Sequence, residues 1–219
     1  FDSFYGTLSE FAILALLPSY LEQGDSSLVY MAQSFIEKTK DNGSDFFLHD
    51  FERLNNAVSR LESEYRSYIL LGVSYALLDF LEVFPQKMKS GFIMETGGMK
   101  GRRKEMTKKE LHHMLSENSG GQPIHSEYGM TELLSQAYSV GEGVYRSPKW
   151  MKVLTRSTTD PLSLVYNQRG LLNIIDLANV NSCSFIATDD LGVVHQDGSF
   201  EVLGRFDSSE IRGCNLMVE

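Results

Sequence analysis

Three short apolar runs in the first half of the chain constrain its fold more than any other feature. Residues 11–17, 68–73 and 91–95 are apolar enough to be strands buried on both faces, and a helical pattern follows each of them. Strand–helix units in succession indicate a mainly parallel sheet flanked by helices. We therefore predict an α/β fold in which ligands bind at the carboxyl ends of the strands.

The helical patterns between these runs begin at residues suited to helix capping. Ser26 or Ser27 can cap the first helix. The apolar positions of that helix have the spacing of a helix that packs on a sheet: Leu28, Met31, Ala32, Phe35 and Ile36. A polar helix is expected at 50–64 and a packed helix at 76–84, and residues 107–110 fit a capping box for one more helix.

The second part of the chain consists of short strands and turns. Residues 170–177 and 184–188 are predicted strands, and Asp197-Gly198 is a predicted hairpin turn. No segment rich in Gly, Ser or Pro separates the two parts. We predict an α/β core over residues 1–150, followed by a smaller β-rich subdomain over residues 151–219 that ends in a hinge-like tail.

The composition argues against several classes of function. The 219 residues carry 20 basic and 29 acidic side chains, a net charge of −9, whereas nucleic-acid-binding proteins usually have a basic excess. We interpret the basic cluster at 100–109 as a solvated helix start. Two cysteines, Cys183 and Cys214, are too few for a disulfide framework and favour a reducing cytoplasm. No apolar run approaches the roughly 18 residues of a membrane span.

The segment Ile124-His-Ser-Glu-Tyr-Gly-Met-Thr-Glu132 is the strongest candidate for a functional site. Gly129 allows close approach of the backbone to a ligand. The Thr131 hydroxyl can donate to a phosphate oxygen, and the Glu132 carboxylate can hold a hard cation such as Mg²⁺. These residues suit a phosphate and metal site, although an ordinary helix start with Thr131 near its cap would show the same pattern.

Two later segments add to this motif. Thr188-Asp-Asp190 follows about 60 residues downstream of it, and Gly204-Arg-Phe-Asp207 about 15 residues further on. In this order the three segments resemble the adenylate-forming superfamily of acyl-CoA synthetases, adenylation domains and luciferases. The segments at 94–101 and 211–214 are most similar to one branch, the long-chain acyl-protein synthetases of bacterial fatty acid reductase systems.

The resemblance implies a reaction and a set of ligands. ATP and Mg²⁺ would be required, and a fatty or other carboxylic acid would be activated as acyl-AMP and then transferred to a thiol. Thr131 would contact the α-phosphate, Glu132 would hold Mg²⁺, and Tyr128 beside Gly129 would pack against the adenine. A reductase that takes over the acyl group would be a partner.

The resemblance assigns roles to residues outside this motif as well. Gly97 and Gly98 would let the backbone run close to the adenine. Asp190 would accept hydrogen bonds from the ribose hydroxyls, and Arg205 would bind ribose or phosphate oxygens. Cys214 in Ile-Arg-Gly-Cys would carry the acyl group as a thioester, although a cysteine without a role would give the same sequence.

The chain departs from the family pattern at several points. Asp189 stands where many relatives have a glycine. The Ser/Thr/Gly-rich phosphate loop would lie upstream of Phe1, and the mobile domain that carries a catalytic lysine is absent, which acyl-protein synthetases tolerate and CoA ligases do not. We therefore interpret the chain as the central and C-terminal part of a larger protein and expect the part alone to be inactive.

Other readings of the sequence stay open. A CoA-forming ligase would share the motifs, and a non-catalytic nucleotide-binding module would share the fold. Ser74 lies between a strand and a helix, where it could be the nucleophile of a serine hydrolase with Asp190 and His195, or simply a helix N-cap. Cys183 is interpreted as a small core residue, and His125 as a structural histidine. The acyl chain, the acceptor thiol and the oligomeric state are not predicted.

Overall fold

The computed structural model describes residues 1–18, 26–97, 103 and 106–206. Two compact units make up the chain, Phe1–Pro148 and Lys149–Glu219. No helix in the described part of the chain is both long enough and apolar enough to cross a membrane.

A mainly parallel sheet forms the centre of the first unit. Its strands are β1 (Ala12–Leu16), β2 (Asp45–Phe46), β3 (Tyr68–Val73), β4 (Gly91–Thr96), β5 (His125–Tyr128) and β6 (Ala137–Ser139). They lie in the order β2-β1-β3-β4-β5-β6, and every pair is parallel except β5 with β6. β1 and β3 are buried along their whole length, as expected for strands covered on both faces.

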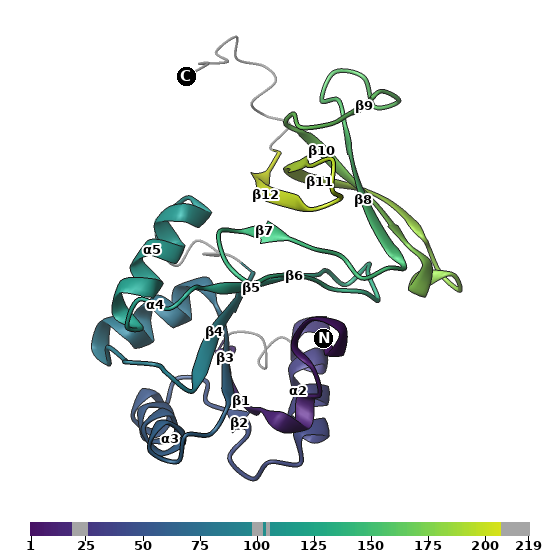
Figure 1. Cartoon of the computed structure of the whole chain (residues 1–219). Helices are drawn as coiled ribbons and strands as arrows, with labels where there is room; N and C mark the ends of the chain where they lie inside the picture. Colours follow the sequence, from purple (N-terminus) through teal and green to yellow (C-terminus); the bar gives the residue numbers. More distant parts are fainter. Residues whose placement is uncertain (19–25, 98–102, 104–105, 207–219) are drawn as a thin grey trace. The chain divides into compact units, whose positions relative to one another are not determined.

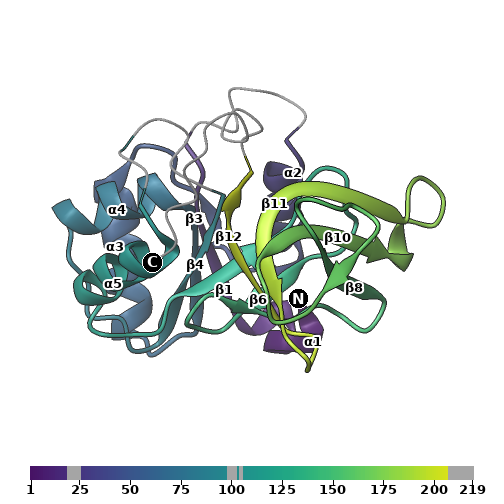
Figure 2. The same cartoon turned by 90° about the horizontal axis from the view of Figure 1, so that it is seen from above.

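Helices cover both faces of this sheet because the order in which successive strands are added reverses after β2. They are α1 (Asp2–Tyr5), α2 (Ser27–Thr39), α3 (Phe51–Ser63), α4 (Ser74–Val83) and α5 (Lys108–Asn118), with a 3-10 turn η1 (Leu8–Glu10). The chain steps from β1 to β2 through α2, and then runs the opposite way through α3, α4 and α5. Right-handed crossovers place α2 on one face and those three helices on the other (Figures 1 and 2).

The change of direction lies between β1 and β3, the kind of position where open α/β sheets bind ligands. Local capping signals fix the helices around it. Ser26 caps α2, Asp50 caps α3, and Thr107 forms the expected capping box with Glu110 at α5. The sequence therefore predicted β1, β3 and the starts of α2, α3 and α5 correctly.

The second unit is an antiparallel sheet. Its elements are β8 (Met151–Arg156), β9 (Leu164–Val165), β10 (Gly170–Asp176), a 3-10 turn η3 (Leu177–Asn179), β11 (Phe185–Val194) and β12 (Phe200–Arg205), while β7 (Val144–Tyr145) belongs to the first unit. The strand order is β12-β11-β10-β8-β9. Asp197-Gly198 lies in the hairpin between β11 and β12, as predicted, where His195 N–H donates to the Ser199 carbonyl over 2.8 Å.

Three features of these units differ from the sequence-based prediction. Val73, not Ser74, is the N-cap residue of α4, and Ser74 is the first helical residue. Cys183 is exposed rather than part of the core. β11 continues to Val194 rather than ending at Thr188, because β12 pairs with residues 190–194.

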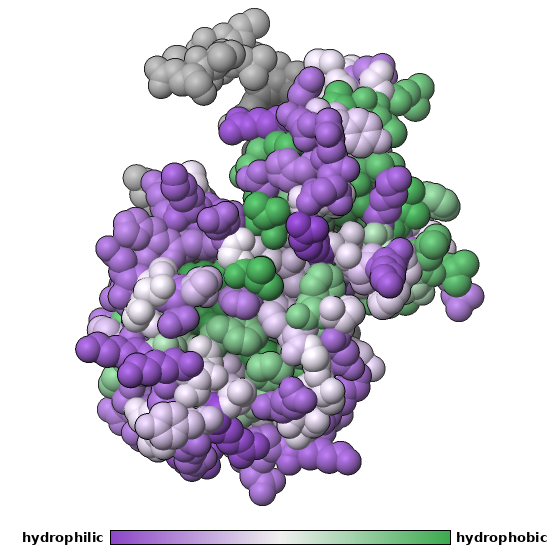
Figure 3. Space-filling view, viewed as in Figure 1, coloured by the Kyte–Doolittle hydropathy of each residue, from purple (hydrophilic) through white to green (hydrophobic). Residues whose placement is uncertain are grey.

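The surfaces of the two units differ in polarity. Most of the visible surface of the first unit is hydrophilic, whereas the second unit shows groups of hydrophobic side chains (Figure 3). The most exposed large apolar side chains of the second unit are Leu162, Val180 and Phe185.

Candidate active site

The loop after β5 presents the two side chains that the sequence motif singled out. β5 ends at Tyr128, and Thr131 and Glu132 follow as neighbouring exposed residues. Because β5 runs parallel to β4, this loop leaves the sheet at the carboxyl edge of the strands. The hydroxyl and the carboxylate therefore stand side by side where the fold is expected to bind ligands.

Gly129 in this loop is closely approached by another residue of the chain. A Cβ at position 129 would lie 2.5 Å from Glu127 Oε1, so any larger residue there would require the Glu127 carboxyl to move. Glycine at this position therefore leaves room for the Glu127 carboxyl group. Gly97, at the end of β4, needs glycine for a different reason, because its φ of 68° is in the left-handed region.

Helix α2 begins next to the loop that carries Thr131 and Glu132. Ser27 is the first residue of α2, and its Oγ lies 3.2 Å from Thr131 Oγ1. The N-terminus of a helix carries unpaired N–H groups and a partial positive charge that favour anions. The structure thus brings a helix N-terminus next to the hydroxyl that was expected to contact a phosphate.

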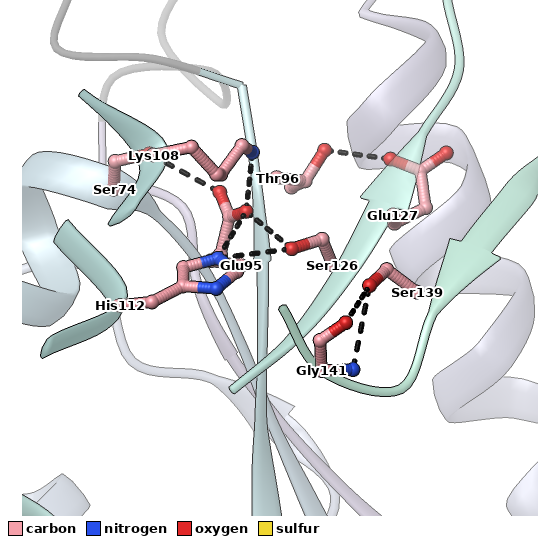
Figure 4. Close-up of polar contacts among 9 residues, drawn as sticks. All are labelled: Ser74, Glu95, Thr96, Lys108, His112, Ser126, Glu127, Ser139 and Gly141. Atoms are coloured by element: carbon pink, nitrogen blue, oxygen red, sulfur yellow. Dashed lines mark hydrogen bonds and ion pairs between the residues drawn. The ribbon is translucent and has the colours of Figure 1, made fainter. Parts of the chain in front are cut away.

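A buried carboxylate, Glu95, organises the polar groups behind this loop (Figure 4). Glu95 is fully buried near the end of β4. Ser126 Oγ donates to its Oε1 over 2.6 Å, and Ser74 Oγ donates to its Oε2 over 3.3 Å. Lys108 Nζ forms an ion pair with Oε1, and His112 Nε2 lies 3.2 Å from the same atom. Glu95 thereby ties β5, α4 and α5 to β4.

Lys108 determines the charge state of this cluster. Burial alone would raise the pKa of Glu95, but the positive charge of Lys108 and the hydrogen bonds from His112, Lys108 and Ser126 lower this pKa to about 2. Burial would lower the pKa of Lys108, and the nearby Glu95 raises it above its ordinary value. Both groups are therefore ionised at neutral pH, and Lys108 is not the solvated residue that the sequence suggested.

A second buried carboxyl, Glu127, lies on the opposite face of the sheet from Glu95. Side chains alternate along β5, so Ser126 points to the Glu95 side and Glu127 to the other (Figure 4). Thr96 Oγ1 donates to Glu127 Oε2 over 2.6 Å. Burial raises the pKa of Glu127 to about 7, with Thr96 acting in the opposite direction.

Figure 4 also shows the turn after β6. Ser139 Oγ donates to the Gly141 carbonyl over 2.8 Å and accepts from the Gly141 N–H over 3.3 Å. Ser139 is paired with Ser126 in the β5–β6 ladder. This turn ends β6, the strand that follows the loop of Thr131 and Glu132.

Aromatic side chains cover the Glu127 face. His125 stacks on Phe92 with ring centroids 4.2 Å apart, and its Nδ1 lies 3.1 Å from Tyr5 Oη. Tyr138 stands opposite Glu127 in the β5–β6 pair and packs edge-on against Tyr5. Burial lowers the pKa of His125 to about 4, so this histidine is neutral at pH 7.

Tyr128 is nearly buried at the end of β5, and its ring packs edge-on against Tyr145 with centroids 5.9 Å apart. The chain itself therefore covers most of the ring that the sequence analysis assigned to adenine packing. Gly98 and Cys214, two other residues of the expected site, lie outside the described residues.

The second unit brings Asp190 and Arg205 together. They are directly opposite each other on β11 and β12, and Arg205 Nε lies 3.8 Å from Asp190 Oδ1. Thr188 Oγ1 accepts from the Asp190 N–H over 3.1 Å, and Arg156 Nη2 donates to the Thr188 carbonyl over 2.8 Å. An acceptor and a donor that stand side by side suit a ribose diol or a phosphate.

Asp189, which stands where many relatives have a glycine, fits its position without strain. Its φ is not positive, so the backbone does not call for glycine there. The side chain is exposed, and its carbonyl accepts from the Phe206 N–H over 2.7 Å. This departure from the family pattern therefore leaves the geometry of β11 intact.

The groups proposed for a serine hydrolase have other partners. Ser74 is only 2% exposed and donates to Glu95, so its hydroxyl is a structural donor. Asp190 faces Arg205, and His195 Nε2 lies 3.1 Å from Glu201 Oε1. Nothing in these contacts activates Ser74 as a nucleophile.

The donor chemistry of the loop fits a magnesium ion that is shared with a nucleotide. Within residues 1–18, 26–97, 103 and 106–206, no three His, Cys, Asp or Glu side chains gather into a metal site of their own. Mg²⁺ is commonly held by one or two carboxylates together with substrate phosphates and water. Glu132, an exposed carboxylate beside Thr131, is suited to that arrangement.

Sequence reasoning missed the polar cluster around Glu95, although two of its residues carry a signal. Glu95 is an acidic residue in an otherwise apolar strand pattern, and Lys108 is a basic residue in the first turn of a helix. Burial in the strand disfavours the negative charge of Glu95, and the helix dipole disfavours a positive charge in the first turn, where Lys108 lies. Two opposite charges at unfavourable positions, 13 residues apart, indicate that they form an ion pair.

The overall fold is that of adenylate-forming ligases. ATP-bound MatB from Rhodopseudomonas palustris superimposes with a TM-score of 0.66 at 16% identity, over 93% of this chain and 42% of that one. O-succinylbenzoate coenzyme A synthetase (MenE) from Bacillus subtilis, in complex with ATP and magnesium ion, gives a TM-score of 0.58 at 19% identity, over 93% and 43%. At these identities the likeness concerns the fold.

The chain belongs to the acyl-protein synthetase family, LuxE, whose sequence profile matches residues 26–219. The long-chain-fatty-acid–luciferin-component ligase of Vibrio harveyi is 24% identical over 185 residues, which are 76% of this chain and 48% of that protein. The chain thus spans about half the length of this curated relative. The resemblance seen in the sequence motifs is confirmed.

Proposed function

We propose that the chain forms the nucleotide-binding core of an enzyme that activates a fatty acid with ATP and transfers the acyl group to a thiol. A carboxylate oxygen of the acid attacks the α-phosphorus of ATP, the bond to pyrophosphate breaks, and acyl-AMP forms. A thiolate then attacks the acyl carbon, and AMP leaves. Family membership and the fatty-acid ligase of Vibrio harveyi support this reaction and this substrate class.

The observation that carries the proposal is the loop after β5. Thr131 and Glu132 are exposed side by side there, and Ser27 at the start of α2 lies next to Thr131. The reaction brings a carboxylate to a phosphate, so the site must offset negative charge with fixed donors. Thr131 would donate to the α-phosphate and the first N–H groups of α2 would face the phosphates. Mg²⁺, held by Glu132, would neutralise charge on the phosphate oxygens.

The remaining family residues would hold the nucleoside. Asp190 would accept from the ribose hydroxyls, and Arg205, which is 82% exposed, would donate to ribose or phosphate oxygens. The backbone at Gly97 and Gly98 would approach the adenine, with the edge of Tyr128 against it. All of these assignments rest on the family motifs. The contact between Asp190 and Arg205 supports the proposal that these two residues bind the same ligand.

ATP–pyrophosphate exchange with the intact protein tests the proposal. We expect exchange that depends on both Mg²⁺ and a fatty acid, with one range of chain lengths preferred in a panel of carboxylic acids. Addition of coenzyme A distinguishes the acceptor, because a CoA ligase would release acyl-CoA and an acyl-protein synthetase would not. A protein that binds nucleotide but shows no acid-dependent exchange would be a binding module instead.

Cys214 is proposed as the thiol that carries the acyl group, as the family resemblance implies. We expect protein incubated with ATP, Mg²⁺ and radiolabelled fatty acid to retain label that neutral hydroxylamine releases. Cys214→Ser is expected to lose this label. Cys183→Ser is the matched control, because Cys183 is the other cysteine of the chain and its thiol is exposed.

The two cysteine variants also define how this prediction would fail. Label that persists in Cys214→Ser, or that disappears only in Cys183→Ser, would remove Cys214 from the mechanism. A thioester at Cys214 would be presented to a second protein, and a reductase that converts the acyl group is the partner that the family suggests.

A further inference from the structure

Glu127 has a hydrogen-bonding environment that differs sharply from that of Glu95. Glu95 receives donors from four side chains, one of them the cation Lys108. Glu127 is almost as deeply buried, yet among the described residues its carboxyl receives one neutral donor, Thr96, and no salt bridge. A buried carboxylate without a cation is costly, so its neutral form is favoured.

Among the residues that the structure describes, the groups that face Glu127 supply no compensating positive charge. His125 on the same strand is neutral, because burial lowers its pKa to about 4. Tyr138 on β6, with Tyr5 beside it, has a pKa that burial raises above its ordinary value, so it is neutral too. Glu95 and Lys108 act through the sheet with opposite signs, and they are paired with each other.

The position of the Glu127 carboxyl links it to the candidate active site. Oε2 accepts from Thr96, the residue before Gly97, and Oε1 lies against Gly129, two residues before Thr131. The Glu127 side chain therefore contacts both the end of β4 and the turn at Gly129, in the loop after β5 that carries Thr131 and Glu132. An ionised carboxylate in this bridge would add negative charge beside a site for phosphates.

We propose that Glu127 is a positioning residue that clamps the turn at Gly129 to the end of β4 in its neutral form, and that its ionisation weakens nucleotide binding. The proposal rests on the function proposed above for this loop. If only the neutral form is competent, the apparent Kd for MgATP scales inversely with the neutral fraction. With a pKa of about 7, that fraction falls about 30-fold between pH 6 and pH 8.5.

The test is calorimetric binding of MgATP to the intact protein at pH 6 and pH 8.5. We expect the wild type to bind more weakly at pH 8.5, by up to about 30-fold, and to take up a proton on binding at that pH. Glu127→Gln is neutral and isosteric, so it is expected to match the wild type at pH 6, to exceed its affinity at pH 8.5, and to take up no proton through residue 127.

Kinetics separate this role from a catalytic one. Saturating MgATP draws Glu127 into its neutral form, so we expect pH to act on KM for MgATP and not on kcat. Glu117→Gln is the matched control, because Glu117 is an exposed glutamate on α5. Glu127→Ala, which leaves Thr96 without its acceptor, is expected to bind weakly at both pH values.

Each outcome decides between the two proposals. Binding with the same pH dependence in Glu127→Gln as in the wild type would overturn the role of Glu127. A pH dependence that Glu127→Gln removes, in a protein without acid-dependent pyrophosphate exchange, would support Glu127 and contradict the adenylation reaction. Absence of MgATP binding at every pH would contradict both.

Discussion

Replacing Glu132 with glutamine is expected to lower acid-dependent pyrophosphate exchange by two orders of magnitude or more. The change keeps the size of the side chain but replaces one carboxylate oxygen with an NH₂ donor and removes the charge that would hold Mg²⁺. A metal ion that offsets charge in the transition state contributes several kcal/mol, and each 1.4 kcal/mol is about tenfold in rate. Initial rates of exchange at saturating ATP measure the effect.

Ser74→Ala is the control for this prediction. If the protein were a serine hydrolase with Ser74 as its nucleophile, this variant and not Glu132→Gln would lose activity. Ser74 donates one hydrogen bond to Glu95, so its loss is expected to cost about 1 kcal/mol of stability and little exchange activity. Activity that survives Glu132→Gln and disappears in Ser74→Ala would contradict the proposed roles of both residues.

The largest effects on stability are expected at the Glu95–Lys108 pair. Lys108→Met leaves a fully buried carboxylate without its cation, and Glu95→Gln leaves the Lys108 ammonium without its anion. Breaking a buried ion pair from one side costs about 3–5 kcal/mol, whereas replacing both partners is often much less harmful. We expect each single variant to unfold at markedly lower urea concentration and the double variant to recover much of the loss.

The double-mutant cycle also shows which result would contradict an interaction between Glu95 and Lys108. If the free-energy changes of the two single variants simply add in the double variant, the two residues do not interact and the cluster is wrongly described. Lys109→Met serves as the control, since Lys109 is exposed on α5 one residue away. Its effect on the urea midpoint is expected to be small.

Acid should weaken the fold through the same carboxylate. The pKa of Glu95 is lowered from 4.5 to about 2 in the folded protein, so its contribution is present above about pH 4.5 and is lost as pH falls towards 2. Glu95→Gln cannot titrate, and its stability is therefore expected to fall less steeply over this range. Urea midpoints measured from pH 5 to pH 2.5 for the two proteins show the difference.

Local patterns allowed the framework of the fold to be predicted from the sequence. β1 and β3 are continuous apolar runs, and α2, α3 and α5 begin at residues whose side chains accept from backbone N–H groups in the first turn. Both signals act within a few residues, so they can be read from the sequence without tertiary information.

Long-range contacts explain what the sequence did not reveal. Ser74 looked like a helix cap because strand and helix meet there, but its partner Glu95 is 21 residues away. Cys183 looked like a core residue because it precedes a strand, although its thiol is exposed. Lys108 looked solvated within a basic cluster, and only the fold places it against Glu95. For Ser74 and Lys108 the error concerns a partner on another element, whereas for Cys183 it concerns exposure, which depends on tertiary packing.

The candidate site was predictable to the extent that it follows family motifs. Thr131 and Glu132 emerged from the motif, as did Asp190 and Arg205, which the structure places side by side. Glu127 did not emerge, because a glutamate in a short polar strand has no special periodicity. Its proposed role depends on its burial, on the lack of a cation beside it in the described part of the chain, and on its contact with Gly129.

The most direct test of the central claim is the fate of the carboxylate oxygen of the fatty acid. The intact protein is given fatty acid labelled with ¹⁸O in the carboxyl group, together with ATP and Mg²⁺, and the AMP is analysed by mass spectrometry. If the carboxylate attacks the α-phosphorus, one labelled oxygen must remain on AMP after the acyl group leaves. AMP without the label, or ADP as the nucleotide product, would contradict the assignment of this chain to acyl-AMP formation.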